Sequence, residues 1–124
     1  MQTMNHGRRA FTLVEIMIVV AIIGLLVAIM IPNVLHARAV AQQKLCIDNL
    51  RMLDAAKQQW ALETGATATT VPAASSIQPY LGRGTGELPL CPLDSAQSFA
   101  TSYNLNNCQT SPTCQVDPGS HVLP

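Results

Sequence analysis

Residues 11–31 of this chain read FTLVEIMIVVAIIGLLVAIMI, and Glu15 is the only ionisable side chain among them. A helix of this length is about 31 Å long, which matches the roughly 30 Å hydrocarbon core of a bilayer. Arg8 and Arg9 come directly before the run, and basic flanking residues tend to stay on the cytoplasmic side. We therefore expect residues 11–32 to cross a membrane, with everything after Pro32 on the far side.

The apolar segment is predicted to be retained in the mature protein. A secretory signal peptide would end in a small-residue cleavage site, whereas this run is followed by PNVLH at residues 32–36. Hydropathy alone favours a plain signal anchor. Glu15 argues against that reading, because a carboxylate inside a membrane costs about 2.5 to 3.5 kcal/mol at the bilayer centre and so needs a positive partner. Cleavage between Ala10 and Phe11 would supply an α-amino group one helical turn from Glu15.

The segment from Arg8 to Glu15, RRAFTLVE, resembles the class III prepilin signal of type IV pilins and type II secretion pseudopilins. The shared features are a short basic leader, a small residue, and then Phe-Thr-Leu-aliphatic-Glu opening an apolar helix. The resemblance implies that prepilin peptidase removes residues 1–10 by cutting after Ala10, and that Phe11 is then N-methylated. The family usually has Gly before the cut, and Ala10 is small enough for the same pocket.

The resemblance further implies that the chain self-associates into a helical filament, driven by an assembly ATPase and a platform protein in the lipid of the inner membrane. Thr12 and Glu15 belong to the motif, and Glu15 would meet the amine of the next subunit and fix its register. Gly24 and Pro32 are expected to interrupt the helix, because Gly costs about 1 kcal/mol and Pro removes one backbone hydrogen bond. Membrane helices tolerate both residues. Pilin-like filaments, in contrast, loosen the helix between a Gly and a Pro so placed.

Beyond Pro32, residues 33–65 are predicted to continue as an amphipathic helix that ends at Gly65. Five side chains recur at spacings of four, three, three and four residues and should share one buried face: Cys46, Leu50, Leu53, Ala56 and Trp60.

Residues 66–124 are predicted to form a loop and a small C-terminal β headpiece. We expect short strands around residues 88–91, 99–105 and 114–116, separated by Pro and Asn turns. The predicted fold class is therefore α+β and pilin-like, with a long N-terminal helix packed on a small antiparallel sheet.

The four cysteines, Cys46, Cys91, Cys108 and Cys114, follow the membrane segment. Exported domains of this size commonly carry disulfides, although a set of free buried thiols is the alternative. Four cysteines allow three connectivities, and the predicted pair is Cys91 with Cys114 because each lies beside a predicted strand. A zinc site is not predicted, because the chain has no CxxC or HxxxH pair.

Composition and motifs favour neither an enzyme nor a nucleic-acid-binding protein. Seven basic residues balance seven acidic ones, and no basic stripe is present for nucleic acid. Asp117, Ser120 and His121 lie in a Pro-Gly tail and are not read as catalytic. Major pseudopilins of type II secretion often bind calcium, but the acids here, Glu87, Asp94 and Asp117, are far apart in sequence, so no cofactor is predicted.

The segment QQWALETG at residues 58–65 and the short headpiece are most similar to the small major pseudopilins. We therefore expect a subunit of a type II secretion pseudopilus that supports protein export. It should cross the bacterial inner membrane once, with a cytoplasmic N-terminus and an extracytoplasmic headpiece. One alternative is a type IV pilus or competence pilin. Another is a membrane-anchored binding domain that never polymerises, which predicts an uncleaved leader and no effect of changing Glu15.

Overall fold

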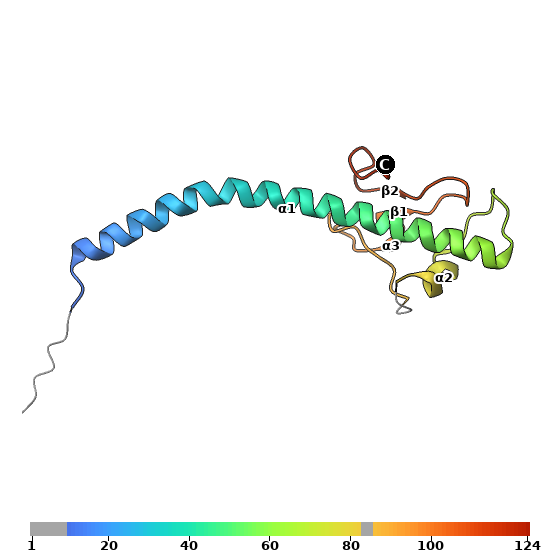
Figure 1. The fold of residues 1–124 in the computed structure, drawn as a ribbon, viewed down its shortest axis with the longest axis horizontal. Helices are drawn as coiled ribbons and strands as arrows, with labels where there is room; N and C mark the ends of the chain where they lie inside the picture. Colours follow the sequence, from blue (N-terminus) through green and yellow to red (C-terminus); the bar gives the residue numbers. More distant parts are fainter. Residues whose placement is uncertain (1–9, 83–85) are drawn as a thin grey trace, which may run out of the picture. The chain divides into compact units, whose positions relative to one another are not determined.

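The computed structural model describes residues 10–82 and 86–124 (Figure 1). Residues 1–9 of the predicted leader, Arg8 and Arg9 included, lie outside this part. The elements are α1 (Leu13–Thr64), α2 (Ala74–Ile77), the 3-10 turn η1 (Gln78–Tyr80), α3 (Phe99–Ser102), β1 (Tyr103–Asn104) and β2 (Thr113–Cys114). The chain divides after Ala37 into two compact units. The second unit, residues 38–124, is called the headpiece below.

Helix α1 contains 52 residues and runs without a break through both Gly24 and Pro32. The expected interruption is therefore absent from the single chain. A proline removes one backbone donor, and the apolar turns on both sides keep the remaining hydrogen bonds of the helix. The loosening implied by the family resemblance concerns the assembled filament and stays a prediction.

The C-terminus of α1 lies at the predicted position. Gly65 follows the last helical residue and has a φ of 64°, in the left-handed region that glycine adopts without strain. The amide of Ala66 donates to the carbonyl of Ala61 at 3.0 Å, as in the helix-ending motif with a left-handed glycine. The prediction that Gly65 ends the helix is confirmed.

The N-terminal part of α1 exposes its apolar side chains. The large apolar residues from Phe11 to Leu35 are between 44% and 81% exposed. By length and composition this part of the helix is able to cross a membrane. A continuous apolar surface of this size needs lipid or other protein around it.

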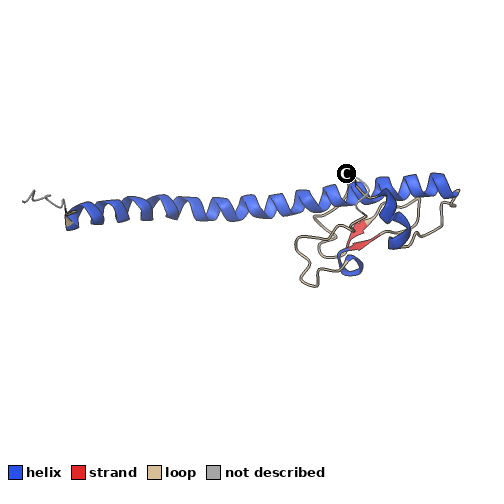
Figure 2. Cartoon of the chain, turned by 90° about the horizontal axis from the view of Figure 1, so that it is seen from below, coloured by secondary structure: helices blue, strands red, loops and turns tan. Residues whose placement is uncertain are grey.

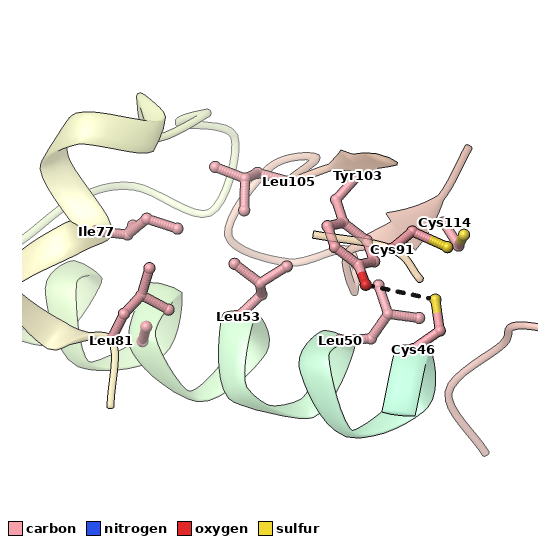
Figure 3. Close-up of a cluster of buried hydrophobic side chains, with 10 residues drawn as sticks. Cys46, Leu50, Leu53, Ile77, Leu81, Cys91, Tyr103, Leu105 and Cys114 are labelled. Atoms are coloured by element: carbon pink, nitrogen blue, oxygen red, sulfur yellow. Dashed lines mark hydrogen bonds between the residues drawn. The ribbon is translucent and has the colours of Figure 1, made fainter. Parts of the chain in front are cut away.

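The headpiece has its own hydrophobic core, and one face of α1 contributes to it (Figure 3). Four of the five side chains predicted for that face are buried, and Trp60 is partly buried against them. Lys57 is also fully buried, which the spacing did not predict. The remaining buried apolar residues come from later segments: Ile77, Leu81, Cys91, Tyr103, Leu105, Cys108 and Cys114.

The sheet consists of β1 and β2, which pair antiparallel with Tyr103 opposite Cys114 and Asn104 opposite Thr113. Figure 2 shows both strands beside the headpiece part of α1. The α+β fold class is thus confirmed, although two of the predicted strand segments differ. Residues 88–91 are irregular, because Pro89 lacks a ladder donor. Residues 99–102 form α3, whose first turn is held by bonds to Ser98.

Side chains of α1 hold the loops of the headpiece through their backbone carbonyls. These helix-to-loop hydrogen bonds replace much of the ladder that a larger sheet would supply. They run from Gln43 to the carbonyl of Ser120 at 2.9 Å, from Asn49 to Leu90 at 3.1 Å, from Lys57 to Leu105 at 3.1 Å and to Thr110, and from Gln58 to Cys108 at 3.0 Å.

Candidate functional site

The predicted assembly residues Thr12 and Glu15 form a reciprocal cap at the start of α1. The backbone amide of Thr12 donates to Oε2 of Glu15 at 2.9 Å, and the Thr12 hydroxyl donates to the same oxygen at 3.1 Å. The amide of Glu15 donates back to the Thr12 hydroxyl at 3.2 Å. This is a capping box, which satisfies amide groups that have no partner within the helix. Part of the cost of placing Glu15 in a membrane is therefore offset within its own chain.

The predicted processing site lies just before this cap. Ala10 and Phe11 are exposed and precede the first helical residue, so the peptide bond between them is not held in the helix. Gly24 lies within α1, and a Cβ atom added there would meet no atom of the described residues within 4 Å. Pro32 also lies within the helix. Folding of the single chain therefore requires no close approach at Gly24.

Three of the four cysteines come together with a histidine in the headpiece core. Ligand atoms of Cys46, Cys91, Cys114 and His121 all lie within 4.8 Å of one another, and all four residues are buried. Cys46 is on α1, Cys91 is in the loop between η1 and α3, Cys114 is on β2, and His121 follows β2. Sγ of Cys114 lies 3.5 Å from Nδ1 of His121. We call this group the Cys3His cluster.

Burial disfavours the thiolate form of two cysteines in the Cys3His cluster. Burial raises the pKa of the Cys46 thiol to about 12 and also raises the pKa of the Cys91 thiol. Burial likewise raises the pKa of Tyr103, whose hydroxyl lies 3.5 Å from Sγ of Cys46 (Figure 3). A metal ion binding here would have to displace protons from the thiols.

The fourth cysteine lies elsewhere in the core. Sγ of Cys108 donates to the carbonyl of Thr70 at 3.2 Å, and Cys108 is not part of the Cys3His cluster. All four cysteines are free thiols in this structure. The sulfurs of Cys91 and Cys114 lie close together, so the predicted disulfide between them stays a prediction.

The acidic and tail residues take structural positions. Asp94 accepts hydrogen bonds from Thr101 and Ser102, which lower its pKa, and Asp117 accepts from Ser120. Within residues 10–82 and 86–124, the one group of three or more possible metal ligands contains none of Glu87, Asp94 and Asp117.

His121 is the functional candidate that the sequence reasoning missed. The sequence places His121 in a polar tail, whereas in the structure its side chain is only 3% exposed and the ring points towards Cys114. The backbone amide of His121 donates to the carbonyl of Asp117 at 3.1 Å, which closes a turn at the Pro-Gly pair. The available sequence signal was the short separation between Cys114 and His121 across that turn.

Comparisons with known proteins agree with the N-terminal features. Residues 5–31 match the family model described as the prokaryotic N-terminal methylation motif. The chain is 46% identical over 56 residues to the type IV major pilin protein PilA of Myxococcus xanthus, covering 45% of this chain and 26% of the pilin. It is 30% identical over 66 residues to the type II secretion system core protein G of Klebsiella michiganensis, covering 53% of this chain and 46% of that protein.

The matched segment thus spans less than half the length of either relative. No solved structure matches the chain significantly. The motif at residues 5–31, the two relatives and the long helix on a small antiparallel sheet all agree. On these grounds the chain is similar to type IV pilins and type II secretion pseudopilins.

Proposed function

We propose that this chain is a structural subunit of a type II secretion pseudopilus, an extracytoplasmic helical filament that supports protein export. The observation that carries the proposal is the exposed apolar surface of residues 11–35, which includes the capped Glu15 near its start. In a membrane this surface contacts lipid, and in a filament it packs against the same helix of neighbouring subunits. If the helix left the membrane for water without such packing, its apolar surface would be exposed to solvent. The cost would be roughly 25 cal/mol for each Å² of apolar area.

The geometry of Glu15 fits a role between subunits. Both hydrogen bonds from Thr12 end on Oε2, and no bond to Oε1 is present within the described residues. The carboxylate therefore keeps an acceptor oxygen and its charge after capping its own helix. The N-methylated amine of Phe11 in a neighbouring subunit would supply the opposite charge. Such a pair fixes the axial register because each subunit has one of each group.

Two features favour a pseudopilus among the possible filaments. The matched segment makes up 46% of core protein G but only 26% of the pilin. The similarity to core protein G also extends over more of this chain, 53% against 45%. A type IV pilus or competence pilin is the second candidate, favoured by the higher identity of 46% to the pilin.

The first experiment is intact mass spectrometry of the chain purified from membranes of a cell that has its own prepilin peptidase. The expected product begins at N-methylated Phe11. The Ala10→Gly variant, which restores the usual residue before the cut, should give the same product. A chain that keeps Arg8, Arg9 and Ala10 would indicate a simple signal anchor, and the filament proposal would then be withdrawn.

A second experiment separates the two roles of Glu15. Glu15→Gln removes the charge and keeps an oxygen for the Thr12 cap, whereas Glu15→Ala removes both. If charge pairing directs assembly, both variants insert and are processed but yield few filaments, as counted by sedimentation and electron microscopy. Glu87→Gln is the matched control, because Glu87 is exposed in the headpiece. Normal filaments from either Glu15→Gln or Glu15→Ala would refute the pairing.

The choice of filament requires the native cell. Deletion of the gene should abolish export through the secretin-linked system if the subunit belongs to a pseudopilus. Loss of surface fibres with normal export would instead assign it to a pilus. An uncleaved leader together with no polymer in either assay would favour the membrane-anchored binding domain.

A further inference from the structure

The Cys3His cluster joins four segments of the chain, and three of them, α1, the loop before α3 and β2, are far apart in the sequence. Its members come from α1, from the loop before α3, from β2 and from the C-terminal turn. Their relative exposures are 0% for Cys46, 2% for Cys91, 1% for Cys114 and 3% for His121. Three sulfurs and one imidazole nitrogen therefore face a common point inside the headpiece. Cys91 and Cys114 approach from one side in Figure 3, and Cys46 approaches from α1.

The distances are close to those of a tetrahedral metal site. Zinc lies about 2.3 Å from thiolate sulfur and about 2.0 to 2.1 Å from imidazole nitrogen, so neighbouring ligand atoms are about 3.5 to 3.8 Å apart. Here the ligand atoms lie within 4.8 Å of one another, and the Cys114 to His121 pair is already at 3.5 Å. A contraction of at most about 1 Å at the widest pair would complete the coordination shell.

Hydrogen bonds around the cluster hold its backbone in place. The amide of Cys91 donates to Oγ of Ser102 at 3.1 Å, and that hydroxyl donates to Asp94 at 2.7 Å. The turn before His121 is closed by its amide bond to Asp117. Such outer partners orient the ligands of metal sites and are part of what makes them bind.

A disulfide explains less of this arrangement than a metal does. A disulfide would join two of the three sulfurs and leave one buried thiol and the imidazole without a role. A metal uses all four groups, and the remaining cysteine, Cys108, lies outside the cluster with its own partner, the carbonyl of Thr70. Three soft thiolates with one imidazole and no carboxylate suit zinc and do not suit calcium or magnesium.

We propose that Cys46, Cys91, Cys114 and His121 form a structural zinc site in the headpiece. Zn²⁺ takes one lone pair from each ligand and displaces one proton from each thiol. Three protons are released, and the closed site has one net negative charge. Because the four ligands come from four segments, zinc ties the loops and the C-terminal turn to α1. This inference does not depend on the filament proposal, because it concerns the headpiece of a single chain.

The test uses the full chain, reduced and solubilised in detergent. Titration with Co²⁺ should give one ion per chain, with thiolate-to-metal charge transfer and the intense visible bands of tetrahedral cobalt. Stoichiometric Zn²⁺ should bleach these bands. A chelator should then lower the melting temperature of the zinc-loaded chain, whereas a phosphine reductant should not.

The variants use the fourth cysteine as a matched control. Cys108→Ser should bind cobalt with the same spectrum, whereas Cys91→Ser and His121→Asn should bind at least about 100-fold more weakly, beyond the effect typical of outer-shell changes. His121→Asn lies in the C-terminal turn, so it tests the site even if a buried Cys91→Ser variant fails to fold. Its cobalt spectrum should also change, because one nitrogen donor is lost.

Two results would overturn the zinc site. The first is a reduced wild-type chain that binds no cobalt, or binds it with a spectrum that Cys91→Ser and His121→Asn leave unchanged. The second is chain isolated from its own cells with a disulfide between two cysteines of the cluster, found by mass mapping after blocking free thiols. The zinc site would be supported if the isolated chain contained zinc and three of its cysteines did not react with the thiol-blocking reagent.

Discussion

Replacing Lys57 by methionine should destabilise the headpiece, although the change removes a charge from its interior. The Lys57 side chain is fully buried, and its ammonium donates to the carbonyl of Leu105 at 3.1 Å and to the carbonyl of Thr110. Asp54 lies 3.5 Å away and is partly exposed. Methionine has a similar length and fills the space, but it donates no hydrogen bond.

The expected loss of stability depends on the two backbone carbonyls that lose their hydrogen-bond donor. Hydrogen bonds from a charged donor contribute about 1.5 to 3 kcal/mol each, and an abandoned buried carbonyl costs about 1 to 3 kcal/mol. Burying an ammonium costs several kcal/mol, and the methionine variant avoids that cost. The partners here are main-chain carbonyls that no substitution removes, so we expect a net loss of about 2 to 3 kcal/mol in the free energy of unfolding. In a domain of this size each kcal/mol lowers the melting temperature by about 4 to 8 °C.

The assay is urea unfolding of residues 38–124, followed by circular dichroism, with the zinc content held equal in all samples. Lys44→Met is the matched control because Lys44 is exposed on the same helix, and it should stay within about 0.5 kcal/mol of wild type. If Lys57→Met is as stable as Lys44→Met, the ammonium does not hold the loops, and the account of their anchoring is wrong.

Three further predictions concern single side chains of the headpiece. Hydrogen bonds from Thr101 and Ser102 lower the pKa of Asp94 in the folded state. The Asp94 carboxylate therefore stabilises the fold at every pH above its unfolded pKa of about 4. This contribution is lost as the pH falls through the lower pKa of the folded state. Asp94→Asn should therefore be less stable at pH 7 and show a weaker loss below pH 4 in thermal melts, and a curve parallel to wild type would contradict this. Leu53→Ala removes a fully buried side chain and should cost about 2 to 5 kcal/mol in urea unfolding, whereas a cost under about 1 kcal/mol would mean that the core is not packed as described. Gly65→Ala forces a residue with a Cβ to adopt a φ of 64°, although the added Cβ would meet no other atom of the described residues. The backbone strain alone should lower the free energy of unfolding by about 1 kcal/mol, and unchanged stability would show that the helix ends differently.

The sequence predicted those parts of the fold that depend on local periodicity. The apolar run, the buried face from Cys46 to Trp60 and the end of the helix at Gly65 all follow from spacing and from glycine geometry, and each is present. The capping box also has a local signature, Thr followed by Glu three residues later, which the argument from the charge of Glu15 does not use.

The rest depended on contacts between distant residues. Residues 99–102 have side chains that suit a strand, yet the Asp94 carboxylate binds the hydroxyls of Thr101 and Ser102 and favours a helical turn. Burial of Lys57 has no local signal, because its partners lie about fifty residues later in the chain. The Cys3His cluster lacks the CxxC spacing of familiar zinc sites, since every ligand comes from a different segment.

The helix-to-loop hydrogen bonds have a consequence for how such a protein changes over evolutionary time. Gln43, Asn49, Lys57 and Gln58 bind carbonyl groups, which every amino acid provides. The outward side chains of the loops can therefore be exchanged without loss of these anchors. A lineage can alter the exposed surface of the headpiece while a handful of helix residues preserves the path of the chain.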